Sequence, residues 1–391
     1  MRKGLAIGIA LSFLVINVFT QNFQEFLDYL NTIPGRERAS AVDSFMVSAG
    51  SQGFPFITGD TATFIYFGKA KSVQIAGDFN NWDPSVSDMQ AVRNTGLWHY
   101  SAVFPMKARL DYKLVINKKE WILDSLNPFT CTGGYGTNSE LSMPAYVQPW
   151  EVLEYEDVPK GSILTFNVNS SFFDDTHQIQ VYLPPGYQKE QGARYPVAYF
   201  TDDYEYLDLG FTKNVIDNLI DSNLICPVIA VFIRPVNRDE EYAGMMIDAF
   251  QSFYIRELVP WIDREFNTLD KPRARAIIGA SYGGNISALI SFNFSDVIGK
   301  CGLHSAAFWP DDYKVFHIIA PGEKKEVTWA SFWGLYEGVS ANLRDFRDSL
   351  LVKEYDLKWQ ELPEGHSWGL WRATTGPMLQ YFFPPDFMEI P

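Results

Sequence analysis

The stretch Ile278-Gly279-Ala280-Ser281-Tyr282-Gly283-Gly284 decides the fold of the larger part of the chain. An apolar run at 276–278 leads into it, and a helix-forming pattern at 285–292 follows it. Glycine on both sides of Ser281 permits a turn so tight that the serine hydroxyl is exposed above a sheet. A motif of this composition occurs by chance about 0.01 times in such a chain. The stretch therefore predicts a strand, a sharp turn and a helix, with a nucleophilic serine at the turn.

Strand and helix patterns alternate on either side of this turn, from about residue 161 to the C-terminus. Apolar runs predict strands at 163–168, 179–183, 197–200, 228–233, 274–278, near 302, at 327–333 and at 357–362. Periodic apolar stripes predict helices at 212–222, 249–266, from 284, at 341–352 and at 368–382. Such alternation builds a mostly parallel sheet with helices on both faces, so we expect an α/β domain over 161–391.

The part of the chain before this domain follows a different pattern. Apolar residues at helical spacing predict two short helices within a segment at 21–58. Short strands separated by turn residues then predict an all-β, immunoglobulin-like sandwich over 59–147. Three prolines flank the acidic stretch 151–157, which predicts a linker over 148–160.

The first residues have the layout of an export signal. Arg2 and Lys3 precede an apolar stretch at 4–16, and Thr20-Gln21 offers a cleavage point, which is typical of a signal peptide over 1–20. The alternative is an uncleaved membrane anchor, but the apolar run is shorter than the ~18 residues that a spanning helix needs. We therefore expect export to the periplasm or the medium, with no stable membrane insertion once the signal is removed.

Composition excludes several classes of partner. The 391 residues include 32 Lys and Arg against 47 Asp and Glu, a formal net charge of −15. Nucleic acid is therefore excluded as a partner, because its binding relies on cations that neutralise phosphates. The five histidines are scattered, and the three cysteines (Cys131, Cys226 and Cys301) show no metal-ligand spacing. We expect no metal, no cofactor and cysteine thiols that lie in the core.

The serine needs a base to take its proton, and in folds of this kind the chain order is serine, acid, histidine. His304 follows Ser281 too closely to leave room for an acid, and His317 lies in an apolar context that favours a structural role. His366 lies in a turn after the predicted strand 357–362, at the sheet edge where α/β sites form. We expect His366 to be the base; the alternative is a surface histidine that caps a helix.

Glu337 is the first carboxylate after the strand that precedes His366, where it can accept the imidazole N–H. The alternative for Glu337 is a solvated turn carboxylate. For the oxyanion hole we expect the backbone N–H of Tyr282 and one from Asp203 or Tyr204, in the loop after an earlier strand. The next strand-end loop carries four residues that either line a substrate pocket or form surface ion pairs: Arg234, Arg238, Glu240 and Tyr242.

These motifs resemble the putative esterase family, also called esterase D-like, which includes enterochelin, feruloyl and acetyl-xylan esterases and mycolyltransferases. The resemblance is carried by Val181-Tyr182-Leu183-Pro184-Pro185-Gly186-Tyr187, Arg256-Glu257-Leu258-Val259-Pro260-Trp261-Ile262-Asp263, the serine motif and Gly365-His366. It covers about residues 161–385 and implies an α/β-hydrolase with Ser281 as nucleophile and His366 as base. The family acid is an aspartate three residues after a strand-end glycine; here Glu337 follows Gly334, which keeps the carboxylate on a longer arm.

The predicted sandwich resembles the glycogen-binding, early-set modules found on starch-active enzymes and some esterases. The segment Ala76-Gly77-Asp78-Phe79-Asn80-Asn81-Trp82 matches the turn that marks these modules. In sugar-binding members two tryptophans, a lysine and an asparagine contact glucan, which here implies Trp82, Lys113, Trp121 and Asn138. The alternative is a module that only packs on the catalytic domain and helps to shape its site.

Together these observations favour a secreted serine ester hydrolase that works through an acyl-enzyme. Acyl or feruloyl esters of polysaccharide suit the added sandwich and the 16% aromatic content. One alternative is a siderophore trilactone, which the negative charge disfavours because ferric catecholates are anionic, and another is acyl transfer. From another class, the alternative is a non-catalytic glycan-binding envelope protein; the intact serine, glutamate and histidine set disfavours it.

Overall fold

The computed structural model describes residues 23–49, 53–202 and 204–387. Contacts divide the chain into two units: an N-terminal unit, up to residue 147 together with 363–365, and a C-terminal unit, 148–362 with 366–391. The predicted signal peptide at 1–20 lies outside the described residues. Among the described helices, none combines the length and the apolar character needed to cross a membrane.

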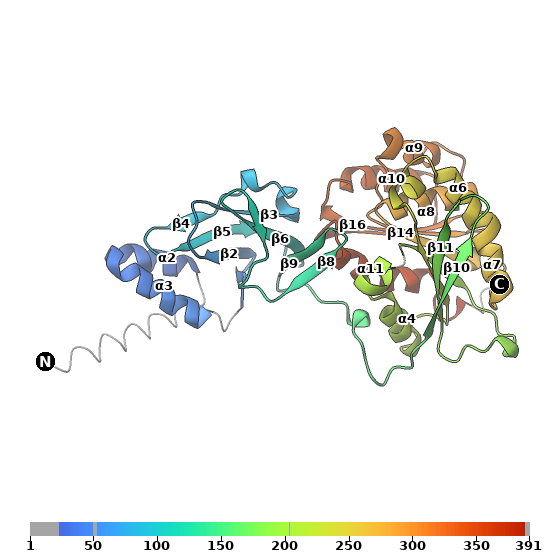
Figure 1. Cartoon of the computed structure of the whole chain (residues 1–391), viewed down its shortest axis with the longest axis horizontal. Helices are drawn as coiled ribbons and strands as arrows, with labels where there is room; N and C mark the ends of the chain where they lie inside the picture. Colours follow the sequence, from blue (N-terminus) through green and yellow to red (C-terminus); the bar gives the residue numbers. More distant parts are fainter. Residues whose placement is uncertain (1–22, 50–52, 203, 388–391) are drawn as a thin grey trace. The chain divides into compact units, whose positions relative to one another are not determined.

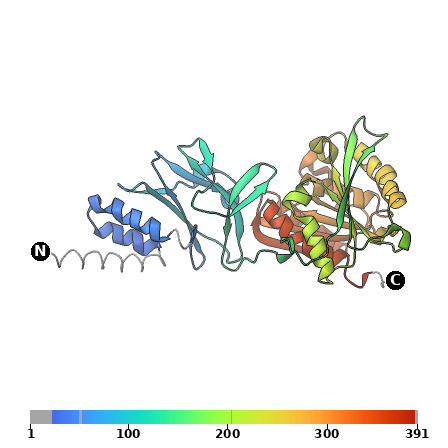
Figure 2. The ribbon, with the colours of Figure 1, turned by 60° about the horizontal axis from the view of Figure 1, so that its bottom comes forward.

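The N-terminal unit contains two β-sheets (Figure 2). Its first sheet is antiparallel and contains, in order, β1 (Phe56–Thr58), β2 (Thr61–Phe67), β5 (Leu97–Val103) and β4 (Gln90–Val92). Its second sheet contains β3 (Val73–Gly77), β6 (Arg109–Ile116), β7 (Glu120–Ile122), β9 (Gly136–Ser142) and β8 (Thr130–Gly133). The predicted β-sandwich is confirmed.

Aromatic side chains fill the space between the two sheets. The rings of Phe64 on β2 and Tyr112 on β6 meet edge to face, with centroids 4.7 Å apart. Phe79 and Phe104 join this cluster, and their own centroids are 5.3 Å apart. Such pairs stabilise a core by more than the burial of their apolar area alone would provide.

Two helices pack on the other face of the first sheet. They are α2 (Phe23–Thr32) and α3 (Gly35–Ala49), so the two predicted N-terminal helices are present. The rings of Phe26 and Phe45 stack with centroids 4.0 Å apart, and the cluster extends to Ile65 on β2. Ile65 and Phe64 are neighbours on one strand and therefore face opposite sides of the sheet.

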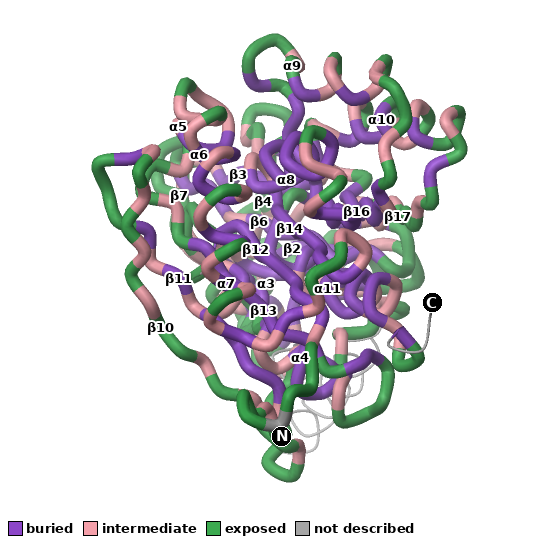
Figure 3. The backbone as a smooth tube through the Cα atoms, turned by 90° about the vertical axis from the view of Figure 1, so that its right-hand side faces the viewer, coloured by how far each residue is buried: buried purple, intermediate pink, exposed green. Residues whose placement is uncertain are grey.

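The C-terminal unit is built around one mixed sheet (Figure 1). Its strands lie in the order β10 (Ser162–Asn169), β11 (Thr176–Leu183), β13 (Ile229–Arg234), β12 (Val197–Thr201), β14 (Arg275–Ala280), β15 (Lys300–His304), β16 (Thr328–Tyr336) and β17 (Leu357–Gly365), of which residues 357–362 belong to this unit. The first two pairings are antiparallel, and those from β13 to β16 are parallel. Strands β12 and β14 are buried throughout (Figure 3).

Helices cover both faces of this sheet. They are α4 (Thr212–Asp221), α5 (Arg238–Ala243), α6 (Ile247–Phe253), α7 (Val259–Glu265), α8 (Tyr282–Asn293), α9 (Pro310–Ile319), α10 (Ser340–Val352) and α11 (Trp368–Phe382). On β15, Cys301 and Leu303 join a core shared with α6 to α10. Gly302, which faces the other way, lies against Met378 of α11. The predicted α/β fold with helices on both faces is confirmed.

The stretch 148–160, a linker by its composition, packs against α4. The side-chain amide of Asn218 donates to the backbone oxygens of Glu151 and Leu153, each at 2.8 Å. Glu151 itself is buried. This segment is therefore held by specific hydrogen bonds within the C-terminal unit.

The cysteines all lie in the interior. Cys131, Cys226 and Cys301 are buried thiols. Burial raises the pKa of the Cys226 thiol to about 11 and that of Cys301 to about 12. All three thiols therefore act as small core groups, as their surroundings predicted.

A buried group of charges crosses the second sheet of the N-terminal unit. Arg109 donates to Asp111 and to Glu140, both at 2.7 Å, and its own side chain is fully buried. Asp78, in the turn after β3, accepts from the indole N–H of Trp82 at 3.0 Å and from the backbone N–H of Asp111 at 2.7 Å. Burial, and then the charge of Asp111, raise the pKa of Asp78 to about 7.

This raised pKa predicts a pH-dependent contribution to stability. Because the pKa in the folded chain exceeds the ordinary value of 3.8, the stability contributed by protonated Asp78 is present below that value and is lost as pH rises to about 7. As pH rises from about 5 to about 8, we expect the parent chain to lose unfolding free energy relative to Asp78→Asn, because asparagine does not titrate. Urea unfolding at both pH values measures this shift. Asp60→Asn, at an exposed position, is the control, and an unchanged difference for Asp78→Asn would contradict the assignment.

Candidate active site

The serine turn joins β14 to α8 in a conformation that few side chains adopt. Ser281 has φ 55° and ψ −118°, a costly combination for a residue other than glycine. A Cβ at Gly279 would lie 2.1 Å from the backbone oxygen of Gly283, and one at Gly283 would lie 2.3 Å from Oγ1 of Thr201. Glycine at 279 therefore lets the end of β14 approach the start of α8, as the motif predicts, and glycine at 283 lets the start of α8 approach β12.

Two backbone hydrogen bonds hold the turn in place. The N–H of Ser281 donates to the oxygen of His304 at 2.9 Å, and the oxygen of Ser281 accepts from the N–H of Ala307 at 3.0 Å. The His304 ring is fully buried, with Nδ1 2.9 Å from the hydroxyl of Tyr206. Burial lowers the pKa of His304 to about 3, so this ring stays neutral and supports the turn. His317, expected in a structural role, is exposed on α9.

The structure brings His366 and Glu337 together. His366 follows β17, Glu337 follows β16, and Nδ1 of His366 lies 2.5 Å from Oε2 of Glu337. The other carboxylate oxygen accepts from the N–H of Gly334 at 2.5 Å, and the Glu337 side chain is fully buried. An imidazole held in this way keeps a proton on Nδ1 and leaves Nε2 to accept another.

Neighbouring groups restrict the orientation of the His366 ring. It meets the ring of Trp371 edge to face, with centroids 5.0 Å apart. The indole N–H of Trp371 donates to the hydroxyl of Ser305 at 3.0 Å, and the N–H of Ser305 donates to the backbone oxygen of Phe332. The ring is therefore positioned by a carboxylate on one side and an anchored indole on the other, while 35% of the His366 side chain is exposed.

Two of the predicted oxyanion-hole residues, Tyr282 and Tyr204, are described by the structure. Tyr282 begins α8, where backbone N–H groups at a helix N-terminus suit negative charge. Asp203 lies outside the described residues, and Tyr204 begins the helical turn η5 (Glu205–Leu209). The N–H of Asp202 is occupied, since it donates to the oxygen of Ile233 at 3.1 Å. The oxyanion roles of Tyr282, Asp203 and Tyr204 stay predictions.

An ion pair between half-buried Arg238 and buried Asp202 braces these loops. From the sequence, Arg238 is expected either to line a pocket or to form a surface ion pair. Arg238 binds Asp202 through two hydrogen bonds, of 2.7 and 2.9 Å, and donates to the oxygen of Ala280 at 3.1 Å. Burial alone would lower the pKa of Arg238, but Asp202 raises it above its ordinary value and keeps the guanidinium charged. The pair thus joins the end of β12 to the residue before Ser281. Asp202 and Arg238 lie 36 positions apart, so local sequence carried no signal of it.

Aromatic rings continue from the serine turn toward solvent. The ring of Tyr282 lies 5.2 Å from that of Trp309, centroid to centroid, and half of Trp309 is exposed. The guanidinium of Arg238 lies 5.8 Å from the centroid of Tyr282 and 5.6 Å from that of Tyr242. This arrangement gives a platform on which a planar group can stack beside Ser281.

The four residues predicted to contact glycan differ in their exposure and hydrogen bonding. Trp121 on β7 is 45% exposed, and Lys113 on the adjacent β6 is partly exposed. The indole N–H of Trp82 donates to Asp78, and the amide of Asn138 donates to Asp111 at 3.1 Å. The indole nitrogen of Trp82 and the amide nitrogen of Asn138 are thus already hydrogen-bonded, and glycan contact by these four residues stays a prediction.

The described residues contain no group of three or more histidine, cysteine or acidic side chains arranged to hold a metal ion.

Two family models match separate parts of the chain. Residues 170–360 match the putative esterase family. Residues 55–129 match carbohydrate-binding module 48, the N-terminal domain of isoamylases. Both resemblances inferred from the motifs are confirmed over these ranges.

Curated proteins match parts of this chain at 28% identity. An endo-1,4-beta-xylanase/feruloyl esterase of Xylanibacter ruminicola is 28% identical over 263 residues, which are 63% of this chain and 34% of that protein. An uncharacterized protein of Bacillus subtilis, YbbA, is 28% identical over 166 residues, or 36% of this chain and 62% of that protein. The chain thus spans less than two thirds of the length of these two relatives.

Solved structures share the fold at low sequence identity. The enterobactin esterase of Shigella flexneri superposes with a TM-score of 0.71 at 17% identity, covering 88% of this chain and 98% of that one. A ferulic acid esterase of Anaeromyces mucronatus gives a TM-score of 0.51 at 18% identity, over 60% of this chain and 95% of that one. At these identities the similarity shows the fold.

The ion pair between Asp202 and Arg238 predicts a clear stability effect. We expect Arg238→Met to lower the unfolding free energy by about 3 kcal/mol, because it leaves Asp202 buried without its partner. Asp202→Asn in the same chain should restore part of this loss. Arg264→Met, which removes an exposed pair with Glu265, should cost at most about 1 kcal/mol. Urea unfolding measures all four chains, and equal losses for the two arginine variants would contradict the bracing role.

Proposed function

We propose that this protein is an exported serine ester hydrolase. The proposal rests on one observation: a serine on a strained strand-to-helix turn in a unit where His366 is hydrogen-bonded through Nδ1 to the buried Glu337. This combination is what nucleophilic catalysis by serine requires, a hydroxyl presented on a tight turn and an oriented base. The family match over 170–360 supports the same reaction class.

The reaction proceeds in two halves. The Oγ of Ser281 attacks the ester carbonyl carbon while His366 Nε2 takes the hydroxyl proton. The tetrahedral intermediate collapses, the carbon–oxygen bond to the alcohol breaks, and His366 returns the proton to the leaving oxygen. Water then attacks the acyl-enzyme with the same proton transfers and releases the acid and Ser281.

Glu337 and the helix start stabilise the charges that appear during the reaction. Glu337 holds the imidazole in one tautomer and stabilises the imidazolium formed when His366 is protonated. The N–H of Tyr282, at the N-terminus of α8, faces the negative oxygen of the tetrahedral intermediate together with a donor from Asp203 or Tyr204. These donors are backbone groups, so they need no reorganisation as the charge develops.

We propose an aromatic acyl ester of polysaccharide, of the feruloyl type, as the substrate. Half-exposed Trp309 beside Tyr282 offers a surface for a planar ring close to Ser281. The relative from Xylanibacter ruminicola is described as a xylanase and feruloyl esterase, which supports the same class. A siderophore trilactone, which also carries aromatic acyl groups, and acyl transfer are the alternatives; a panel of feruloyl, acetyl and trilactone esters separates them.

The proposed catalytic roles predict that substitutions of Ser281 and Glu337 lower activity by different factors. We expect Ser281→Ala to lower kcat on p-nitrophenyl acetate by at least about 10³-fold, and Glu337→Gln by about 10²-fold to 10⁴-fold, because an amide no longer holds the imidazole or stabilises its charge. Glu323→Gln, at an exposed position, is the matched control and should retain activity. No hydrolysis by the parent chain, or equal hydrolysis by Ser281→Ala, would exclude the proposed reaction and favour the glycan-binding alternative.

The aromatic platform predicts a change in acyl preference. We expect Trp309→Ala to raise KM for methyl ferulate about threefold to tenfold, because a ring stacking contact is lost, and to leave KM for an acetyl ester nearly unchanged. Steady-state kinetics on the two esters measure this difference. Trp309→Phe keeps an aromatic face and should retain most of the preference. An equal rise in KM for both esters would contradict the stacking role.

A further inference from the structure

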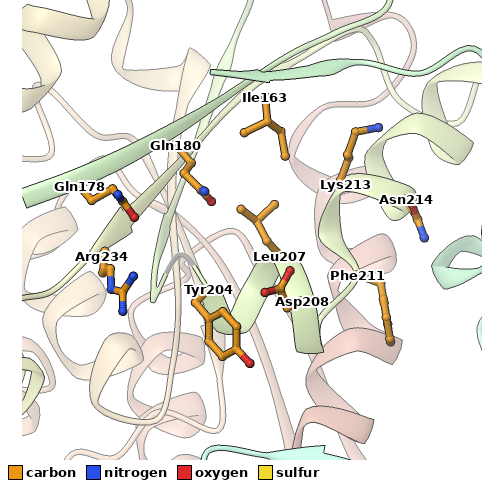
Figure 4. Close-up of a pocket in the computed structure, with 10 residues that line it drawn as sticks. All are labelled: Ile163, Gln178, Gln180, Tyr204, Leu207, Asp208, Phe211, Lys213, Asn214 and Arg234. Carbon is orange, nitrogen blue, oxygen red and sulfur yellow. The ribbon is translucent and has the colours of Figure 1, made fainter. Parts of the chain in front are cut away.

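A pocket of about 400 Å³ opens on the C-terminal unit, beside strands that carry none of the proposed catalytic residues (Figure 4). Gln178 and Gln180 of β11 and Arg234 of β13 line one side of it, while Leu207 and Phe211 from the region of η5 and α4 line the other. Its volume lies within the range of small-molecule sites. Gln178 pairs directly with Arg234 across the two strands, so these side chains leave the sheet on the same face.

Strand register places this pocket close to the serine turn. Ile233 pairs with Thr201 and Ile278 pairs with Phe200, so Arg234 and Ala280 lie at the same level of the sheet. Strand β12 separates them, and with about 4.8 Å between strands their backbones are about 10 Å apart. The pocket therefore adjoins Ser281 along the sheet edge, at a distance suited to a substrate group several bonds from the scissile carbonyl.

The strand-borne side chains of the pocket are available to a ligand. Gln178, Gln180 and Arg234 form no side-chain hydrogen bond or ion pair with any residue that the structure describes. They project from a sheet whose backbone is fully paired at these positions. Groups held on rigid strands lose little conformational freedom on binding, which favours directed hydrogen bonds to a ligand.

The charges that line the pocket offset one another. Lys213 is paired with Asp217 at 2.6 Å, and Arg234 is offset by the carboxylate of Asp208 in the same pocket. An anion such as a phosphate or a ferric catecholate would meet this carboxylate and the net charge of −15. The pocket therefore favours a neutral, polar ligand.

The donor and acceptor set matches a sugar. A glutamine amide donates and accepts, as does every sugar hydroxyl, and Gln178 and Gln180 lie two residues apart on one strand face. The rings of Tyr204 and Phe211, which are 55% and 39% exposed, offer apolar faces for the C–H groups of a pyranose or furanose ring. A lipid acyl chain would leave the amides and Arg234 without hydrogen-bond partners.

We infer that this pocket binds the sugar part of a glycan ester while the acyl group lies over Ser281. The inference rests on the proposed ester hydrolysis and adds to it a specific glycan subsite within the C-terminal unit. Gln178, Gln180 and Arg234 bind sugar hydroxyls, and the rings of Tyr204 and Phe211 flank the sugar. The subsite selects the alcohol side of the ester, independently of the aromatic acyl group.

The test compares two feruloyl esters that differ only in the alcohol. Gln178→Ala combined with Gln180→Ala should raise KM about tenfold for a feruloylated arabinoxylan oligosaccharide, with kcat unchanged, because two hydrogen bonds to the sugar are lost. The ratio of KM values for the oligosaccharide ester and methyl ferulate therefore rises about tenfold. Gln360→Ala, which removes an exposed glutamine from another strand, is the control, and thermal unfolding shows that each variant is folded. An unchanged ratio, whether KM rises for both esters or for neither, would overturn the subsite.

A binding measurement separates the subsite from the proposed function. Ser281→Ala in the full chain should bind the unesterified oligosaccharide in isothermal titration calorimetry, and the added pair of glutamine substitutions should weaken this binding about tenfold. If no ester is hydrolysed but this difference is found, the subsite stands and the proposed function fails. If esters are hydrolysed but the glutamine substitutions alter neither binding nor the KM ratio, the subsite fails and the proposed function stands.

Discussion

The turn at Ser281 depends on glycine at 279 and 283, where a side chain would block two close approaches. A Cβ at Gly283 would lie 2.3 Å from Oγ1 of Thr201 on β12, and one at Gly279 would lie 2.1 Å from the backbone oxygen of Gly283, where the end of β14 meets the start of α8. Their close approach holds Ser281 at a φ of 55° and places its hydroxyl at the carboxyl edge of the sheet. The same approach places the first N–H groups of α8 next to Ser281, where the proposed ester hydrolysis would develop negative charge. The roles proposed for Glu337 and His366 presuppose this turn.

Buried charges then set the positions of the loops around the turn. Arg238 links Asp202, at the end of β12, to the backbone oxygen of Ala280 beside Ser281. Removing Arg238 would leave the buried carboxylate of Asp202 without its partner, which is costly, so the pair favours this arrangement of the loops. The N-terminal unit also contains an arginine paired with carboxylates: Arg109 donates to Asp111 and to Glu140. In both units a guanidinium, which keeps its charge when buried, occupies the centre.

Two kinds of surface flank the proposed nucleophile, and each suits one half of an ester. Trp309 and Tyr282 present aromatic faces, while the pocket around Gln178 and Arg234 presents unpaired polar groups with balanced charge. A planar acyl group and a hydroxyl-rich alcohol require these two environments. If the proposed substrate is correct, a chain with a net charge of −15 would bind it through stacking and hydrogen bonds, without ionic attraction.

The sequence by itself determined the features that depend on local pattern: the alternation of strands and helices, the sandwich before it and the serine turn, because glycine requirements and hydrophobic periods act over a few residues. It also placed Glu337 and His366 at strand ends, and the tertiary structure brought the two within 2.5 Å. Only the tertiary structure decided that Arg238 pairs with Asp202, that the stretch 148–160 packs on α4, and that Gln178 stands beside Arg234. These contacts join residues far apart in the chain, and they depend on strand order and register, which the packing of the whole sheet sets.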